Sequence, residues 1–192
     1  MNKKEYFNNE YKHIKNKIVV KDLQYLINLV PDYFFEIPAS STGKYHPAYA
    51  SGEHGLVRHT KAAVRIAVEF FNDESICKFS EFDQDLIIMA LVLHDSFKSG
   101  NPKEKYTRAD HPLLASHFIM EHQKELSLDL DSIRKVCSMI ESHMGPWNTD
   151  YRTHEEILPK PKSASERFVH MCDYLASKKL FEIAFDGIEV KY

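Results

Sequence analysis

A chain of 192 residues with 43% hydrophobic and 28% charged residues has an ordinary globular composition and is long enough to bury a sizeable core. A net charge of −3 and a pI near 6.4 exclude a global basic field that would recruit nucleic acid. The polar segment from Met1 to Lys17 excludes a signal peptide, and no apolar run approaches the roughly 18 residues of a membrane span. The three cysteines lack zinc-ribbon spacing, so we expect reduced thiols and a cytoplasmic protein.

Apolar residues recur at three- and four-residue spacing, which is the periodicity of amphipathic helices. In chain order, the predicted helices cover about 22–30, 56–71, 85–95, 112–123, 131–145 and 163–179. The stretch LIIMALVL, residues 86–93, fits a strand by composition alone, but its methionine, alanine and leucine content favours a buried helix. Ser163 and Glu166 form a capping-box pattern that predicts the start of the last helix.

No internal repeat, low-complexity tract or linker divides the chain, so we expect one all-α helical-bundle domain over residues 1–192. A helical extension over about 1–44 precedes a core over about 45–180. The tail carries Asp186-Gly187 between two short alternating runs, which is a weak signal for a β-hairpin.

Eleven histidines are a high number for this length, and several fall on apolar helix faces, where an unpaired imidazole is costly. His59 precedes Ala63 by four residues and Ile66 by seven, so it lies on the inward face of its predicted helix. The pair His94-Asp95 closes the most apolar predicted helix. These three side chains are therefore expected to point toward the core.

Asp173 shares an apolar helix face with Ala176, so its carboxylate, like that of Asp95, is aimed at the interior. A buried carboxylate must be paired or bound to a metal. Any one of the inward histidines, taken alone, is more often a hydrogen-bonded core residue than a metal ligand. The joint pattern of His59, His94 and the two carboxylates favours a divalent metal such as zinc, iron or manganese.

A histidine, a His-Asp pair and a late aspartate, each on a separate helix, resemble the HD superfamily of metal-dependent phosphohydrolases. The matching segments are HGLVRHT (54–60), LVLHDSFKSG (91–100) and VHMCDYLASKK (169–179). Lys98, three residues after Asp95, is similar to the lysine of the HD-x-x-K signature. The resemblance covers about residues 45–180. Within the superfamily, the chain is most similar to the HD domain attached to certain bacterial 3′–5′ exoribonucleases. It implies a metal bound by His59, His94, Asp95 and Asp173.

Two further segments resemble HD enzymes that bind two metals. They are HPLLASHFI (111–119), which is similar to an HP-led helix, and IESHMG (140–145), which is similar to a histidine-bearing helix end. The resemblance implies that His111 and His143 bind a second metal, with Asp95 bridging the pair. Some two-metal relatives have a histidine where this chain has Met144, so one and two ions both stay open.

Other residues near this predicted site keep two interpretations. His117 competes with His111 but lies about 120° away around the helix. Lys98 is either a phosphate contact, as the resemblance implies, or a solvated charge. Trp147, the only tryptophan, either stacks on a base or plugs the edge of the core. No special role is assigned to the remaining histidines, His13, His46, His54, His122, His154 and His170.

The resemblance implies hydrolysis of a phosphate ester by one or two divalent ions (Mn, Fe, Ni, Zn, Co or Mg), which activate water and polarise the phosphoryl oxygens. Asp95 would be both a ligand and an orienting catalytic group, and Lys98 would neutralise charge on the phosphate. The expected substrate is a nucleotide or nucleic acid, and the acidic bulk charge favours the smaller one. The rivals are a non-catalytic HD module that binds a nucleotide or a partner protein, and a helical protein whose histidines are merely core residues.

Overall fold

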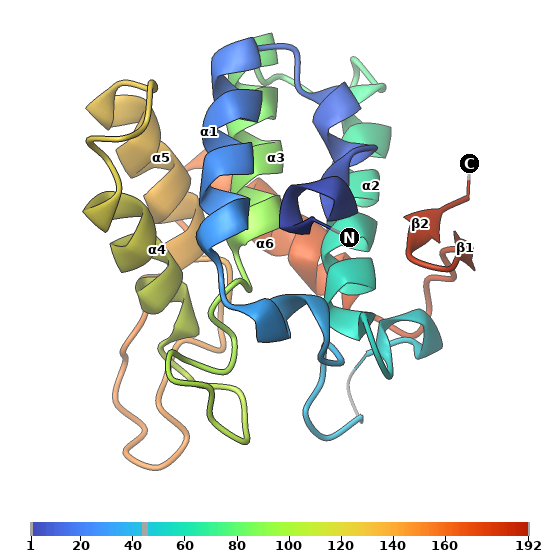
Figure 1. Cartoon of the computed structure of the whole chain (residues 1–192), viewed down its shortest axis with the longest axis vertical. Coiled ribbons are helices and arrows are strands. Elements are labelled where there is room, and N and C mark those ends of the chain that lie inside the picture. Colours follow the sequence, from blue (N-terminus) through green and yellow to red (C-terminus); the bar gives the residue numbers. More distant parts are fainter. Residues whose placement is uncertain (1, 44–45, 192) are drawn as a thin grey trace.

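A computed structural model of the chain describes residues 2–43 and 46–191 (Figure 1). Its α-helices are α1 (Lys17–Leu29), α2 (Gly55–Phe71), α3 (Glu81–Leu93), α4 (His111–Glu121), α5 (Leu130–Glu141) and α6 (Ala164–Ala176). Four short 3-10 helices, η1 (Lys3–Phe7), η2 (Glu10–His13), η3 (Asp32–Phe35) and η4 (Ala48–Ala50), accompany them. Strands β1 (Phe185–Asp186) and β2 (Glu189–Val190) form the C-terminal hairpin. The all-α class and the hairpin are thus confirmed, and no described helix is long and apolar enough to cross a membrane.

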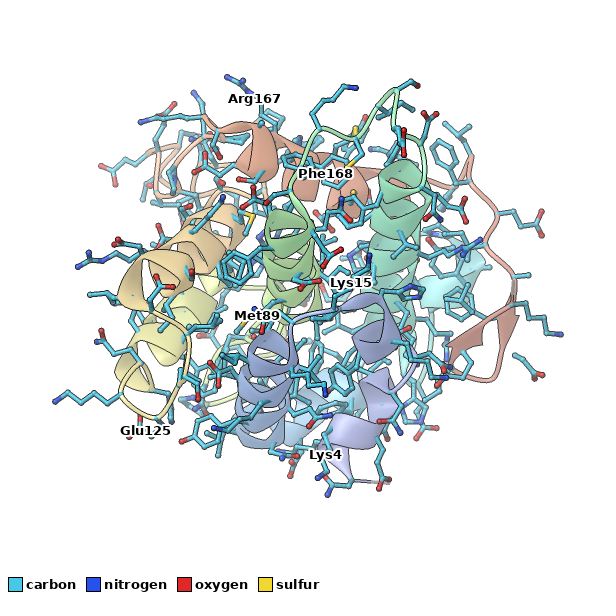
Figure 2. All side chains as sticks on the ribbon, turned by 90° about the horizontal axis from the view of Figure 1, so that it is seen from above. Lys4, Lys15, Met89, Glu125, Arg167 and Phe168 are labelled. Carbon is cyan, nitrogen blue, oxygen red and sulfur yellow. The ribbon has the colours of Figure 1, made fainter. Side chains whose placement is uncertain are left out.

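The apolar stretch 86–93 is a helix, and it occupies the centre of the molecule. Every residue of α3 from Asp85 to Leu93 is buried, as a helix that is apolar all round requires. Figure 2 shows α3 between α2 on one side and the pair α4 and α5 on the other, with α1 and α6 on the remaining sides. The residues that follow α3 are consequently enclosed by the other helices.

Helix boundaries differ from the predicted ones where caps or turns intervene. α1 starts at Lys17, five residues before the predicted start, because the Asn16 side chain accepts a hydrogen bond from the Ile18 amide at 2.8 Å. The first turn of α1 contains Ile18, Val19 and Val20, and the buried Val19 lies four residues before Leu23, so it extends the apolar face of the helix by one turn. α5 ends at Glu141, and turns carry the chain on to Gly145. The capping box at Ser163 is present as predicted, but α6 ends at Ala176 rather than near Lys179.

The segment before α2 packs into the same hydrophobic cluster as the helices that follow it. Phe7, Leu26 and Phe34 are fully buried in that cluster. The Asp85 carboxylate on α3 accepts hydrogen bonds from the backbone amides of Lys15 (3.0 Å) and Asn16 (2.8 Å), which anchors the start of α1. The predicted boundary between extension and core, at residues 44 and 45, lies outside the described part of the chain.

The two ends of the described chain meet at Lys61 on α2. The Lys61 ammonium is fully buried and lies 2.7 Å from Glu189 Oε1 on β2 and 3.6 Å from Glu10 Oε2 on η2. Asn9 donates a further hydrogen bond to Glu189 at 2.8 Å. Both terminal segments are therefore fastened to the helix that carries His59.

Candidate metal centre

Imidazole and carboxylate groups from five helices or helix ends converge below the C-terminal end of α3. They are His59 on α2, His94 and Asp95 directly after α3, His111 at the start of α4, His143 just after α5, and Asp173 on α6. The four histidines and Asp95 are at most 1% exposed, and the Asp173 side chain is 18% exposed. All six side chains that the sequence assigns to metal binding are therefore neighbours in the structure.

Asp95 is the central residue because its two carboxylate oxygens face different histidines. Oδ2 lies 3.4 Å from His94 Nε2 and 3.8 Å from His59 Nε2. Oδ1 lies 3.0 Å from His111 Nε2 and 3.8 Å from His143 Nε2. One carboxylate thus separates two pairs of imidazoles.

Asp173 completes the group on the Oδ2 side. Its Oδ1 atom lies 2.8 Å from His59 Nε2 and 3.4 Å from His94 Nε2. His59, His94 and Asp173 each offer one donor atom, and these atoms lie within 4.8 Å of one another. His94, Asp95 and His143 form a second such group. Two overlapping sets of donors are therefore close enough to hold metal.

Backbone carbonyl groups orient three of the histidine rings. Nδ1 of His94 lies 2.6 Å from the Leu91 carbonyl oxygen, and Nδ1 of His111 lies 2.7 Å from that of Arg108. His143 repeats the arrangement, with Nδ1 2.7 Å from the Ile140 carbonyl oxygen. Because a carbonyl can only accept, Nδ1 carries the proton in each ring and Nε2 is directed at the centre, which is the usual support for a metal-bound histidine.

Burial and charge act in opposite directions on these groups. Burial lowers the pKa of His94, but Asp95 and Asp173 outweigh it and raise that pKa to about 10. Burial disfavours ionised Asp95, yet Lys98 and His94 hold its pKa well below the ordinary value. Burial and the charge of His94 lower the pKa of His143 to about 3, so this ring is neutral at pH 7. The carboxylates are ionised, and a metal would replace the proton that they hold on His94.

The donor set fits a divalent metal because several of its polar atoms lack other partners. His94 Nε2, Asp95 Oδ1 and His111 Nε2 are buried and make no hydrogen bond among the described residues. A buried polar atom without a partner costs about 1–3 kcal/mol, so three at one point need a common explanation. Nitrogen and carboxylate donors together suit zinc, iron, manganese and similar ions.

The centre opens into a cavity of about 510 Å³, a size typical of small-molecule sites. Asp95, His143 and Asp173 contribute to its wall. The other lining residues are His46, Lys98, Met144, Trp147, Tyr174, Ser177 and Lys178. A ligand in this cavity therefore has direct access to the carboxylates and imidazoles.

The family model of the HD domain matches residues 53–178, a range that contains all six converging side chains. The chain belongs to the HD domain family. HD domains are generally metal-dependent hydrolases, in agreement with the donor groups found here. Neither the curated proteins nor the solved structures gave a match.

Lys98 of this HD domain points into the centre. Its ammonium lies 2.5 Å from Asp95 Oδ2, and its side chain is only 12% exposed. The backbone amide of Lys98 also donates to the Asp95 carbonyl oxygen at 3.0 Å, so both residues share one turn after α3. Lys98 is therefore not a solvated charge, and it lies where a cation or a phosphate would meet Asp95.

His46, to which the sequence assigns no special role, lines the cavity of the HD domain. Its ring centroid lies 4.8 Å from that of His59. Burial, followed by the charge of His59, lowers the pKa of His46 to about 3, so the ring is neutral at pH 7. His46 lies in the loop before Pro47, where no helical periodicity reports the direction of a side chain.

The structure also separates the competing histidines. His117 is exposed on α4, whereas His111 is buried at the centre. His170 lies behind the site, with Nδ1 2.7 Å from the His143 carbonyl oxygen. His122 caps its own helix region through the Phe118 carbonyl at 2.8 Å. Of the two competing histidines on α4, the structure thus places His111 beside Asp95 and His117 at the surface.

Proposed function

We propose that this HD domain is a metal-dependent phosphohydrolase that cleaves a phosphate ester of a nucleotide or nucleic acid, and that it uses two divalent ions. The proposal is supported by the positions of the two carboxylate oxygens of Asp95. One of its oxygens faces His59 and His94, and the other faces His111 and His143. A single bridging carboxylate between two sets of imidazoles is the arrangement that a two-metal centre needs.

Under this proposal, His59, His94, Asp95 and Asp173 hold one ion, and Asp95, His111 and His143 hold the other. Bound there, the ions would supply a nucleophile from water near neutral pH and polarise the phosphoryl oxygens. Met144, which replaces a histidine found in some two-metal relatives, lines the cavity and leaves the second group with three protein ligands.

Lys98 acts on the substrate rather than on the metal. With an ion beside Asp95, the carboxylate no longer needs the ammonium as its counter-ion, so Lys98 is free to turn toward a phosphate in the cavity. A charge-assisted hydrogen bond to a phosphate oxygen then neutralises charge and fixes the ester in place. Lys98 already lines the cavity, so its ammonium can reach a phosphate there without passing other side chains.

The nucleotide class is supported by the resemblance to the HD domain of bacterial 3′–5′ exoribonucleases. Two alternative functions predict different features of the site. A non-catalytic HD module has no need to keep all six donors, and a purely structural set of histidines would be hydrogen-bonded. The buried atoms without partners at His94, Asp95 and His111 disfavour the structural alternative.

A panel assay tests the proposed function. Phosphate release is measured from nucleotides, phosphodiesters and sugar phosphates with manganese, nickel, magnesium or zinc, alongside metal analysis of the protein. Asp95→Ala should lose bound metal and activity together, while His117→Ala, an exposed histidine on α4, should keep both. Turnover by Asp95→Ala equal to wild type would overturn the assignment, and a metal-free wild type would support the structural rival.

A further inference from the structure

Two aromatic rings and a lysine form one wall of the cavity that contains Asp95 and Lys98. These three residues, Trp147, Tyr174 and Lys178, are called the aromatic platform below. The rings of Trp147 and Tyr174 are stacked, with centroids 5.6 Å apart and planes inclined by 17°. The Lys178 ammonium lies 3.8 Å from the Tyr174 ring centroid and 5.6 Å from that of Trp147.

The aromatic platform is open to solvent, which is unusual for rings of this size. Trp147 is 54% exposed and Tyr174 is 37% exposed. A tryptophan that plugged the edge of the core would be mostly buried, so the plugging interpretation of Trp147 does not hold. Large aromatic faces left open beside charged groups are the usual form of a recognition surface for flat ligands.

Trp147 is held in a fixed relation to the metal centre. It follows His143 by four residues, and Gly145 between them has a φ of +58°, which favours glycine. A Cβ at Gly145 would overlap the His170 ring, so no other residue fits there without displacing that ring. The His170 Nδ1–H donates to the His143 carbonyl oxygen at 2.7 Å. The turn that carries Trp147 is thus built on the same backbone as His143.

Tyr174 is also tied to the metal centre, because it directly follows Asp173 on α6. Lys178 comes one turn later and covers the Tyr174 ring. The aromatic platform therefore spans two segments, each of which also supplies a side chain to the metal centre. A ligand that contacts both the metal centre and the aromatic platform must extend from the carboxylates to the rings.

We propose that the aromatic platform is the subsite for the base of a nucleotide, which stacks on Trp147 while its phosphate lies between Asp95 and Lys98. Lys178 supplies a second positive charge near the sugar and phosphate. Stacking on an aromatic side chain is worth about 1–3 kcal/mol per base, which corresponds to about a 5-fold to 150-fold change in affinity. Substrates with a base are therefore preferred over sugar phosphates that lack one. The phosphate end of this subsite rests on the proposed function, whereas the stacking does not.

Binding can be observed without turnover because Trp147 is the only tryptophan. Adenosine monophosphate, mixed rapidly with the magnesium-loaded protein before turnover, should change the Trp147 fluorescence in a saturable manner. Ribose 5-phosphate should leave it unchanged at the same concentrations. A short oligoribonucleotide distinguishes a free nucleotide from a strand end by its relative affinity, since both present the same base and phosphate. Equal fluorescence changes with both sugar phosphate and nucleotide, or none with either nucleotide probe, would overturn the subsite.

Kinetics provide the second readout. Trp147→Ala should raise KM for adenosine monophosphate about 5-fold or more and leave KM for ribose 5-phosphate and the metal content unchanged, while Trp147→Phe restores most of the loss. Tyr151→Ala removes an exposed aromatic side chain from the same loop but outside the cavity, and it should behave as wild type. An equal rise of KM for both esters in Trp147→Ala overturns the subsite and leaves the hydrolysis standing. A protein that releases no phosphate but responds to the nucleotide in fluorescence keeps the subsite and loses the proposed hydrolysis.

Discussion

His111 Nε2 lies 3.0 Å from Asp95 Oδ1, and both atoms are buried without a hydrogen-bond partner among the described residues. The other ring nitrogen of His111, Nδ1, donates to the Arg108 carbonyl at 2.7 Å, which directs Nε2 at Asp95. A divalent ion between Nε2 and Oδ1 would take both atoms as ligands, since imidazole nitrogen and carboxylate oxygen are both metal donors. This relationship is the strongest reason to expect an ion on the Oδ1 side of Asp95.

The first prediction follows from that contact. Wild-type protein saturated with manganese should contain two ions per chain, and His111→Ala should retain one and lose most activity, because the second group then lacks a ligand. His117→Ala is the matched control, since it removes an exposed imidazole from the same helix. Elemental analysis after gel filtration measures the stoichiometry. One ion per wild-type chain under excess metal would refute the two-metal centre, and the assignment to the HD domain family would still stand.

Lys98 leads to a second prediction. Its ammonium neutralises Asp95 Oδ2 at 2.5 Å, so Lys98→Met should bind metal at least as tightly as wild type, because a competing cation is gone. The same variant should lose about 10-fold or more in kcat/KM, the expected cost of a charge-assisted hydrogen bond to phosphate. Titration with metal and steady-state kinetics separate the two effects. Weakened metal binding in Lys98→Met would show that the lysine supports the ligands instead of the substrate.

Metal binding should depend on pH through His94, whose pKa rises to about 10 beside Asp95 and Asp173. Below that pKa the ring is protonated, and a metal must displace the proton, so affinity increases with pH. Between roughly pH 6 and 8, the apparent association constant should rise about tenfold per pH unit for each proton released. His143, with a pKa of about 3, contributes no proton in this range. Calorimetry in buffers of different ionisation enthalpy counts the protons, and a pH-independent affinity would contradict the assignment.

Local signals explain which parts of the fold could be predicted from the sequence. The helix that carries His59 and the capping box at Ser163 depend on residues a few positions apart, and both were predicted correctly. The start of α1 at Lys17 also has local signals, because Asn16 caps the helix and Val19 lies four residues before Leu23 on the same apolar face. The position of α3 at the centre follows from its uniformly apolar surface, which leaves no side for solvent.

Local sequence signals also decide which residues of the metal centre could be predicted. Four metal-centre residues lie on or next to periodic helices, so their inward direction could be predicted, and the family resemblance added His111 and His143. His46 could not be found this way, because tertiary packing of a loop directs it against His59. The sequence also left the role of Trp147 open. Only the fold brings Tyr174 and Lys178 beside it and shows its ring to be exposed.

The buried Lys61 gives a prediction about stability that is independent of the metal centre. Its ammonium lies between Glu189, on the C-terminal hairpin, and Glu10, on η2, at 2.7 Å and 3.6 Å. Lys61→Met removes the charge while keeping the volume, and it leaves Glu10 buried without a counter-ion. Breaking a buried ion pair in this way typically costs about 3–5 kcal/mol of unfolding free energy. Adding Glu10→Gln should recover part of the loss, because the uncompensated charge is then removed as well.

The pH dependence of that loss has a definite sign. Burial already raises the pKa of Glu10, with the Lys61 charge opposing it, so Lys61→Met should raise this pKa further. A carboxyl whose folded pKa exceeds its unfolded pKa binds more protons in the native state, and stability therefore falls as the pH rises between the two values. The destabilisation of Lys61→Met should consequently be larger at pH 8 than at pH 5, and the difference should vanish in the double variant. Urea unfolding at both pH values measures it, with Lys21→Met, an exposed lysine on α1, as the control. A loss of stability in Lys61→Met that is the same at both pH values would mean that Glu10 is not the group that responds.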